Sequence, residues 1–241
     1  MSGGIEIRGL GVEFPGRRVF DGFDMVFPEN AVSVLLGGSG VGKTTLLNAV
    51  AGLTPYTGEM ILPEGGVSYI FQKDRLIPQL SVYKNLDLVL KGIVRDKAER
   101  KRRITLMLEK LEIGSEAAKL PRELSGGQAQ RVSVVRAFLF PAPVLLMDEP
   151  FRALDIGLKF RLLDALAGLL GESPRTVIYV THDPDECMYA ADFWTVLSGS
   201  PAKVAGRGEI TIPRGARDPA SPVMAAERAR LLSLLRDGAE K

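Results

Sequence analysis

The sequence has few of the residues from which covalent or metal-bound frameworks are built. Its 241 residues include one cysteine, Cys187, and one histidine, His182. One cysteine excludes an internal disulfide framework and any multi-cysteine metal site, and one histidine excludes a multi-histidine metal site. The chemistry of this protein therefore has to come from other residue types.

Long apolar runs and an excess of one charge are also missing. The 31 basic and 29 acidic residues leave a net charge of +2, whereas a nucleic-acid-binding domain is usually strongly basic, so we expect no nucleic-acid partner. No run reaches the roughly 18 apolar residues that cross a bilayer, and residues 1–6 show no apolar secretory core. We expect one large cytoplasmic domain that meets a membrane only through a partner.

A glycine-rich stretch, GGSGVGKTT at residues 37–45, lies between the apolar runs 31–36 and 46–51. Strand, loop and helix in this order, with the pattern G-x-x-x-x-G-K-T, predict a phosphate-binding loop rather than a flexible turn. Lys43 would reach the β- and γ-phosphates of a nucleotide, and the Thr44 hydroxyl would bind Mg²⁺. The predicted nucleotide contacts are Gly37, Gly38, Ser39, Gly40, Val41, Gly42, Lys43, Thr44 and Thr45.

Short alternating runs precede this loop, at residues 5–7, 12–14 and 23–27. They predict an antiparallel sheet beside the nucleotide core. Phe14 at its edge could stack on adenine, although a half-buried strand aromatic is the more common case.

Gln72 follows a short predicted strand at residues 66–71 and is either a surface residue or a sensor of a metal or attacking water. Beyond it the chain is predicted to be helical, and we expect the basic run 97–103 to be a solvated helix face. Residues 124–128, LSGGQ, open a helix over 129–140 that Pro141 stops. Ser125 suits its N-cap, so the glycines beside it would form a second anion site.

Two wholly apolar runs, 143–147 and 176–181, read as buried parallel strands joined by a helix over 158–170. They deliver Asp148, Glu149 and His182 to one edge of a parallel α/β sheet. Asp148 would hold Mg²⁺ through water and Glu149 would orient or deprotonate the attacking water, unless the two acids only cap a helix. His182, alone more often structural, could there hydrogen-bond a γ-phosphate oxygen. We expect residues 196–197 to end the sheet and 225–235 to form a closing helix.

Together these motifs resemble the ATP-binding cassette ATPases of ABC transporters, in order and over nearly the whole chain. The matching elements are the aromatic Phe14, the Walker A loop 37–45, the Q-loop residue Gln72, the signature 124–128, the Walker B strand and glutamate 144–149, the D-loop 153–155 and the switch histidine His182. The resemblance implies a P-loop NTPase (RecA-like) α/β fold with a mostly parallel sheet core, an N-terminal antiparallel β subdomain and an inserted α-helical subdomain. We expect one domain, with core 1–72 and 141–220, helical subdomain 73–140 and C-terminal helix 221–241.

The resemblance also implies a mechanism. Two copies, expected to be identical, would dimerise head to tail, with each ATP between one Walker A loop and the partner's signature motif. The catalytic residues would be Glu149, His182 and Gln72, and the Mg²⁺ ligands Thr44, Gln72 and Asp148. The nucleotide contacts would further include Phe14, Ser125, Gly126, Gly127, Gln128 and Asp155.

The segments 72–78, 81–85 and 148–151 are most similar to importer cassettes for nitrate, sulfonates and taurine. Thiamine-precursor importers share much of this pattern, and a soluble non-transport ATPase or a catalytically dead cassette are further alternatives. Expected partners are a transmembrane permease, contacted on the inner face of the cell membrane, and indirectly a periplasmic or lipoprotein solute-binding protein. Lys73 and Arg152 depart from the family pattern, where an acid and a glycine are common.

Overall fold

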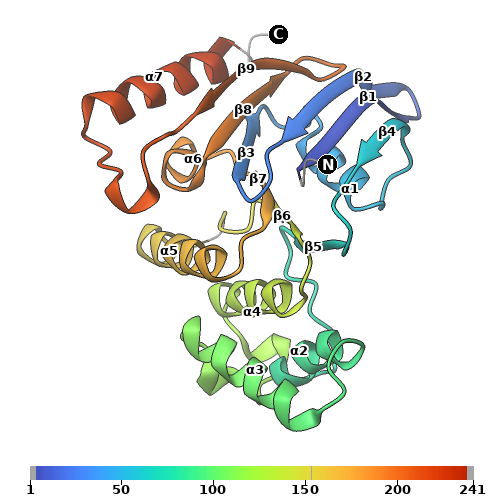
Figure 1. The fold of residues 1–241 in the computed structure, drawn as a ribbon, viewed down its shortest axis with the longest axis vertical. Helices are drawn as coiled ribbons and strands as arrows, with labels where there is room; N and C mark the ends of the chain where they lie inside the picture. The colour runs from blue at the N-terminus through green and yellow to red at the C-terminus, as the bar shows by residue number, and fades with distance from the viewer. Residues whose placement is uncertain (1–3, 153, 238–241) are drawn as a thin grey trace. The chain divides into compact units, whose positions relative to one another are not determined.

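A computed structural model describes residues 4–152 and 154–237 (Figure 1). The chain divides into two compact units. The first takes the described residues of 1–67, 143–149 and 174–241, and the second takes 68–142 and the described residues of 150–173. The sequence-based boundaries, with a helical subdomain over 73–140, stay a prediction.

The first unit begins with an antiparallel sheet of order β2-β1-β4, formed by β1 (Ile5–Phe14), β2 (Arg17–Phe27) and β4 (Thr57–Ile61). The sequence predicted two separate strands over 5–7 and 12–14, and the structure joins them into one. The register of β1 against β2 shifts between Ile7 and Val12, where Gly9 has a φ of 61°. A β-bulge of this kind keeps the strand continuous while interrupting its alternation, so the pattern looked like a break.

A larger sheet supplies the core of the first unit, in the order β6-β7-β3-β8-β9. Its strands are β3 (Val32–Gly37), β6 (Val144–Asp148), β7 (Thr176–Val180), β8 (Phe193–Ser198) and β9 (Lys203–Glu209). The pairings from β6 to β8 are parallel, and β6 and β7 are buried along their whole length. The predicted parallel α/β core is therefore confirmed.

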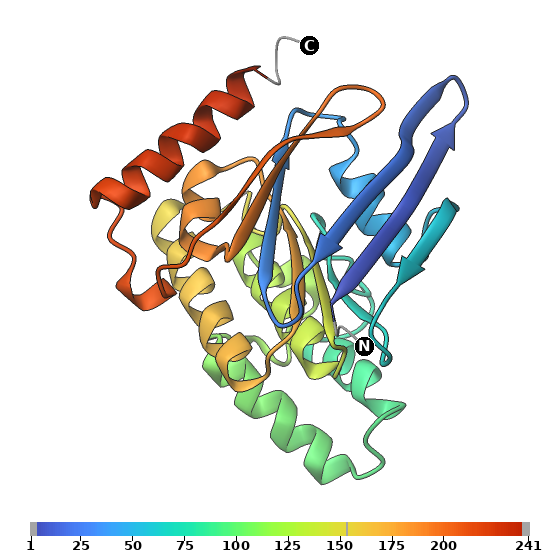
Figure 2. The same cartoon turned by 45° about the horizontal axis from the view of Figure 1, so that its top comes forward.

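The prediction that the sheet ends at residues 196–197 was wrong. β9 adds an antiparallel edge strand beside β8, and α7 (Pro222–Asp237) packs on both (Figure 2). Gly206 and Gly208 make this possible, because a Cβ at either position would lie 2.5 Å or less from Leu234 or Glu227. Glycines in a strand weaken its sequence pattern, which explains the missed strand. The other helices of this unit are α1 (Lys43–Val50), α6 (Pro184–Ala190) and the short η3 (Arg214–Ala216).

The second unit is mainly helical. The first residue of β5 (Val67–Ile70) belongs to the first unit, and the rest of this strand belongs to the second. The helices of the second unit are α2 (Val82–Lys91), α3 (Lys97–Lys110), η1 (Gly114–Glu116), η2 (Pro121–Glu123), α4 (Gly126–Leu139) and α5 (Ile156–Glu172). No helix in the described ranges is both long enough and apolar enough to cross a bilayer.

The basic run on α3 is solvated except at one position. Arg100 is 8% exposed, and its guanidinium donates to Asp87 over 2.6 Å and to the Val94 carbonyl over 3.0 Å. Since a buried cation needs such partners, this arginine joins α3 to α2. The expectation of a fully solvated face was wrong there, because charge alone does not tell which member of a run turns inward.

Candidate functional site

The glycine-rich loop leaves β3 and enters α1, as the sequence predicted. Gly37, Gly40 and Gly42 have φ values of 146°, 76° and 118°, in the region that favours glycine. At Gly37 a Cβ would also lie 2.3 Å from the carbonyl oxygen of Leu197. The backbone can therefore curl here only with these glycines, and the free N–H groups at the start of α1 suit an anion.

Lys43 lies within the loop that precedes it. Its ammonium group donates to the carbonyl oxygens of Gly37 and Gly38 over 2.8 and 2.9 Å. Burial lowers the pKa of Lys43, and the nearby carboxylates of Glu149 and Asp148 oppose that shift. The loop thus holds its own cation at the position where a phosphate would need one.

Thr44 and Asp148 come together from separate elements. The Thr44 hydroxyl donates to a carboxylate oxygen of Asp148 over 3.1 Å, at the carboxyl end of β6. Burial is the main cause that raises the pKa of Asp148, and the hydrogen bond from Thr44 opposes it. Among the described residues, no three acidic, histidine or cysteine side chains form a metal-binding group. Two adjacent oxygen donors fit Mg²⁺, which takes few protein ligands and keeps water and substrate phosphates as the others.

Glu149 and His182 lie at the same edge of the sheet, because β6 and β7 pair in parallel with Asp148 opposite Val180. His182 Nδ1 is 3.6 Å from Glu149 Oε2. The Glu149 side chain is 16% exposed and that of His182 is 56% exposed, so both can reach a ligand. The structure therefore brings together the glutamate and the histidine that the sequence predicted to lie at one edge of the sheet.

Phe14 ends β1 and is 44% exposed. Its partner across the hairpin is Arg17, whose guanidinium donates to the Gly40 carbonyl of the loop. The hairpin carrying Phe14 is thus fixed to the glycine-rich loop. Sequence reasoning missed Arg17, because an arginine beside a turn carries no motif.

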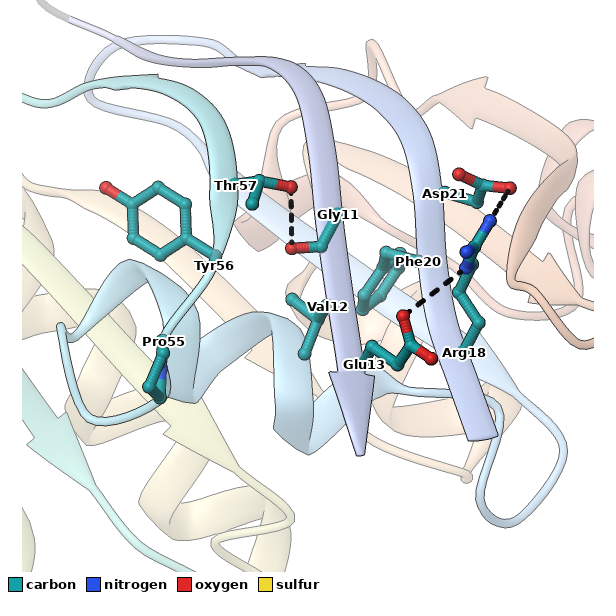
Figure 3. Close-up of a pocket in the computed structure, with 9 residues that line it drawn as sticks. All are labelled: Gly11, Val12, Glu13, Arg18, Phe20, Asp21, Pro55, Tyr56 and Thr57. Carbon is teal, nitrogen blue, oxygen red and sulfur yellow. Dashed lines mark hydrogen bonds and ion pairs between the residues drawn. The ribbon is translucent and has the colours of Figure 1, made fainter. Parts of the chain in front are cut away.

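A pocket of about 400 Å³ also lies on the antiparallel sheet of this unit (Figure 3). Val12, Phe20 and Tyr56 contribute apolar surface, and Arg18 forms ion pairs with Glu13 and Asp21 at the rim. Neither Phe14 nor residues 37–45 line it. No motif in the sequence predicted this pocket.

The remaining predicted residues belong to the second unit. Ser125 caps α4: its hydroxyl accepts from the Gln128 N–H over 3.2 Å, and the Gln128 side chain accepts from the Ser125 N–H over 2.8 Å. The helix starts at Gly126, three residues earlier than predicted. The predicted N-cap at Ser125 is confirmed. The first N–H groups of α4 belong to exposed or half-buried residues.

Gly127 sits at that N-terminus, where a Cβ would lie 2.8 Å from Leu158. Asp155 caps α5 by accepting from the Leu158 N–H over 2.9 Å. Gln72 is exposed just after β5. Ala153 of the predicted D-loop lies outside the described residues.

Comparison with known proteins identifies the family. The chain matches the family described as ABC transporter over residues 20–152. It is 38% identical over 232 residues to the aliphatic sulfonates import ATP-binding protein SsuB 3 of Nocardia farcinica, covering 96% of this chain and 90% of that protein. It is also 38% identical over 238 residues to SsuB 1 of Paracoccus denitrificans, covering 98% and 95%.

Solved structures agree with the sequence comparisons. The dimeric structure of MJ0796, a bacterial ABC transporter cassette, matches with a TM-score of 0.78 at 26% identity, over 87% of this chain and all of that chain. The fold of cbiO1 from Clostridium perfringens matches with a TM-score of 0.78 over 96% of both chains. The chain belongs to the ATP-binding cassette ATPases of the ABC transporter family.

Proposed function

We propose that this chain is the ATP-hydrolysing subunit of an importer for a small anionic solute of the sulfonate, taurine or nitrate class. The observation that carries the ATPase assignment is the cluster of Lys43, Thr44, Asp148, Glu149 and His182 at one edge of the larger sheet. The solute class is supported by the two similar proteins described above, both of which are named as aliphatic sulfonates import ATP-binding proteins.

In the proposed reaction, the phosphates of ATP occupy the loop 37–42. Lys43 exchanges its two carbonyl contacts for the β- and γ-phosphate oxygens, and the N–H groups at the start of α1 point at the same charge. Thr44 and Asp148 would hold Mg²⁺, which neutralises charge that develops on the transferred phosphoryl group. Phe14 offers an exposed aromatic face for the adenine ring.

Glu149 is the proposed general base. Its carboxylate orients the attacking water and accepts a proton from it as the oxygen approaches the γ-phosphorus. His182 donates a hydrogen bond to a γ-phosphate oxygen and stays within 3.6 Å of Glu149. Gln72 is proposed, from the family resemblance, as a Mg²⁺ ligand and a sensor of the attacking water.

A second copy of the chain is proposed to complete each site. Ser125, Gly126, Gly127 and Gln128 would present the N-terminus of α4 to the γ-phosphate bound by the partner copy, and Asp155 would lie at the same interface. The dimeric cassette among the solved structures supports such pairing. The pair would act on a transmembrane permease, at the inner face of the cell membrane, that receives its solute from a binding protein.

A growth experiment tests the solute class. Deletion of the gene should prevent growth on an alkanesulfonate or taurine as the sole sulfur source, while growth on sulfate stays normal. Wild-type protein should restore growth and the Glu149→Gln variant should not. A deletion strain that grows normally on these sulfur sources and on nitrate, but requires added thiamine, would assign the chain to thiamine-precursor import instead.

A further inference from the structure

A carboxylate outside the proposed reaction lies buried in contact with Thr181, the residue that precedes His182. Glu186, in the first turn of α6, is 2% exposed. Its Oε2 atom accepts hydrogen bonds from the Thr181 hydroxyl, over 2.6 Å, and from the Tyr179 hydroxyl. Since a buried carboxylate destabilises a fold unless donors compensate for lost water, these two hydroxyls account for its placement.

The hydroxyl of Thr181, which precedes His182, has two partners, and one of them is the N–H of Asp183, which follows His182. It donates its proton to Glu186, and it accepts from the backbone N–H of Asp183 over 3.1 Å. A hydroxyl has one proton, so the carboxylate fixes its direction and leaves a lone pair for the Asp183 N–H. The backbone on both sides of His182 is therefore tied to one oriented hydroxyl.

The network is anchored in rigid elements at both ends. The Thr181 N–H donates to the Leu35 carbonyl of β3 over 3.2 Å, and Asp183 caps α6 by accepting from the Asp185 N–H over 2.9 Å. Burial, and then the charge of Glu186, raise the pKa of Tyr179 well above its usual value, so this hydroxyl stays a donor. The exposed imidazole of His182 thus projects from a buried, hydrogen-bonded support.

We propose that Glu186 is a positioning residue for His182, acting through the Thr181 hydroxyl. It is 2% exposed and has no role of its own in the proposed reaction, so its effect on the reaction passes through the placement of the imidazole. The inference rests on the proposed function, in which His182 contacts the γ-phosphate.

The test compares three substitutions in the full-length, untagged chain. Glu186→Leu removes the acceptor, Thr181→Val removes the linking hydroxyl while keeping the branched shape, and Glu186→Gln keeps one acceptor oxygen. We expect the first two to lower kcat for ATP about ten- to a hundredfold, the usual consequence of a misplaced catalytic group, with KM changed less than about threefold, since nucleotide binding uses other residues. Glu186→Gln should restore most of kcat.

Two readouts separate positioning from general damage. In a His182→Ala background, Glu186→Leu and Thr181→Val should cause almost no further loss of kcat, because residues acting as one unit are not additive. His182 is the only histidine in the chain, so its imidazole NMR signals are unambiguous. They should shift in both variants, without bound nucleotide, at temperatures where each is folded. Cys187→Ala is the matched control, since Cys187 is the next buried residue on α6, and should leave the signals and kcat unchanged.

The outcomes are distinct. An undisturbed imidazole signal, or a loss of kcat that adds fully to that of His182→Ala, would overturn the role of Glu186 and leave the proposed function standing. Normal turnover by His182→Ala itself would instead refute the role given to the histidine in the proposed function, and the positioning role with it.

Discussion

The hydroxyl of Thr44 donates to the carboxylate of Asp148 across 104 positions of sequence, over 3.1 Å. The contact joins the start of α1 to the end of β6. Asp148 is 6% exposed, and burial raises its pKa. The aspartate is therefore placed for a metal at some expense to the stability of the free protein.

The destabilisation caused by the buried carboxylate can be measured with Asp148→Asn. Because the pKa is raised on folding, the folded state binds the proton more tightly, and the cost of the charge appears as pH rises through the folded-state pKa. The neutral amide should raise the melting temperature of the nucleotide-free protein at pH 7.5, on the order of 2 °C, and lower Mg²⁺-dependent turnover at least about tenfold.

The pH dependence provides the control. The difference in melting temperature should vanish below the unfolded-state pKa of about 4, where the wild-type carboxyl is neutral in both states. A stabilisation that persists unchanged at low pH would show that charge burial is not its cause.

Glu149→Gln should keep ATP binding and lower turnover about 10²- to 10⁴-fold, because the amide cannot accept the proton of the attacking water. The trapped ATP should hold two copies together, so size-exclusion chromatography with ATP should show a dimer that the nucleotide-free variant lacks. Normal hydrolysis by a variant that stays monomeric with saturating ATP would contradict both roles.

Lys43→Ala and Ser125→Arg should each abolish turnover, the first by losing the phosphate-binding cation and the second by blocking the shared interface. Ser125→Arg should still bind ATP, which fluorescence of a labelled nucleotide can measure. Lys43→Ala should bind it weakly or not at all.

Mixing these two variants tests whether the site is shared. A mixed dimer contains one site with the intact Lys43 of one copy and the intact Ser125 of the other, so part of the activity should return. If each site were complete within one chain, the mixture would stay inactive. Two copies of Ser125→Arg alone serve as the inactive control.

Phe14→Ala should raise KM for ATP about five- to 150-fold with little change in kcat, because base stacking on an aromatic ring contributes about 1–3 kcal/mol. Phe14→Tyr keeps the aromatic face and should behave as wild type. Tyr56→Ala, which removes another exposed aromatic from the same sheet region, should leave KM unchanged. An equal effect from both alanine variants would argue against a specific stacking role.

The sequence predicted the site better than the edges of the fold. Short motifs with fixed spacing identified the loop around Lys43, the paired acids at the carboxyl end of β6 and the cap at Ser125, because phosphate and metal chemistry allow few residue types at those positions. The edge strand β9 escaped prediction, since its glycines serve close packing against α7 and leave no alternating pattern.

Contacts between distant segments were beyond the reach of local patterns. Arg100 was expected in solvent with its basic neighbours, and only the partner Asp87 on another helix reveals why it is buried. Arg17 and Glu186 belong to no catalytic motif, and their contacts with Gly40 and Thr181 depend on how the chain is folded. Such residues become visible once coordinates place their partners.

The backbone at Glu149 has a φ of 44°, a left-handed conformation that favours glycine over side chains such as glutamate. A glycine there would fit the backbone at least as well, so folding alone does not preserve the glutamate. A lineage no longer dependent on hydrolysis could lose Glu149 through drift and still produce a well-folded cassette. An intact fold in a relative therefore does not show that the relative hydrolyses ATP. Position 149 is the first to inspect when relatives that hydrolyse ATP have to be distinguished from relatives that do not.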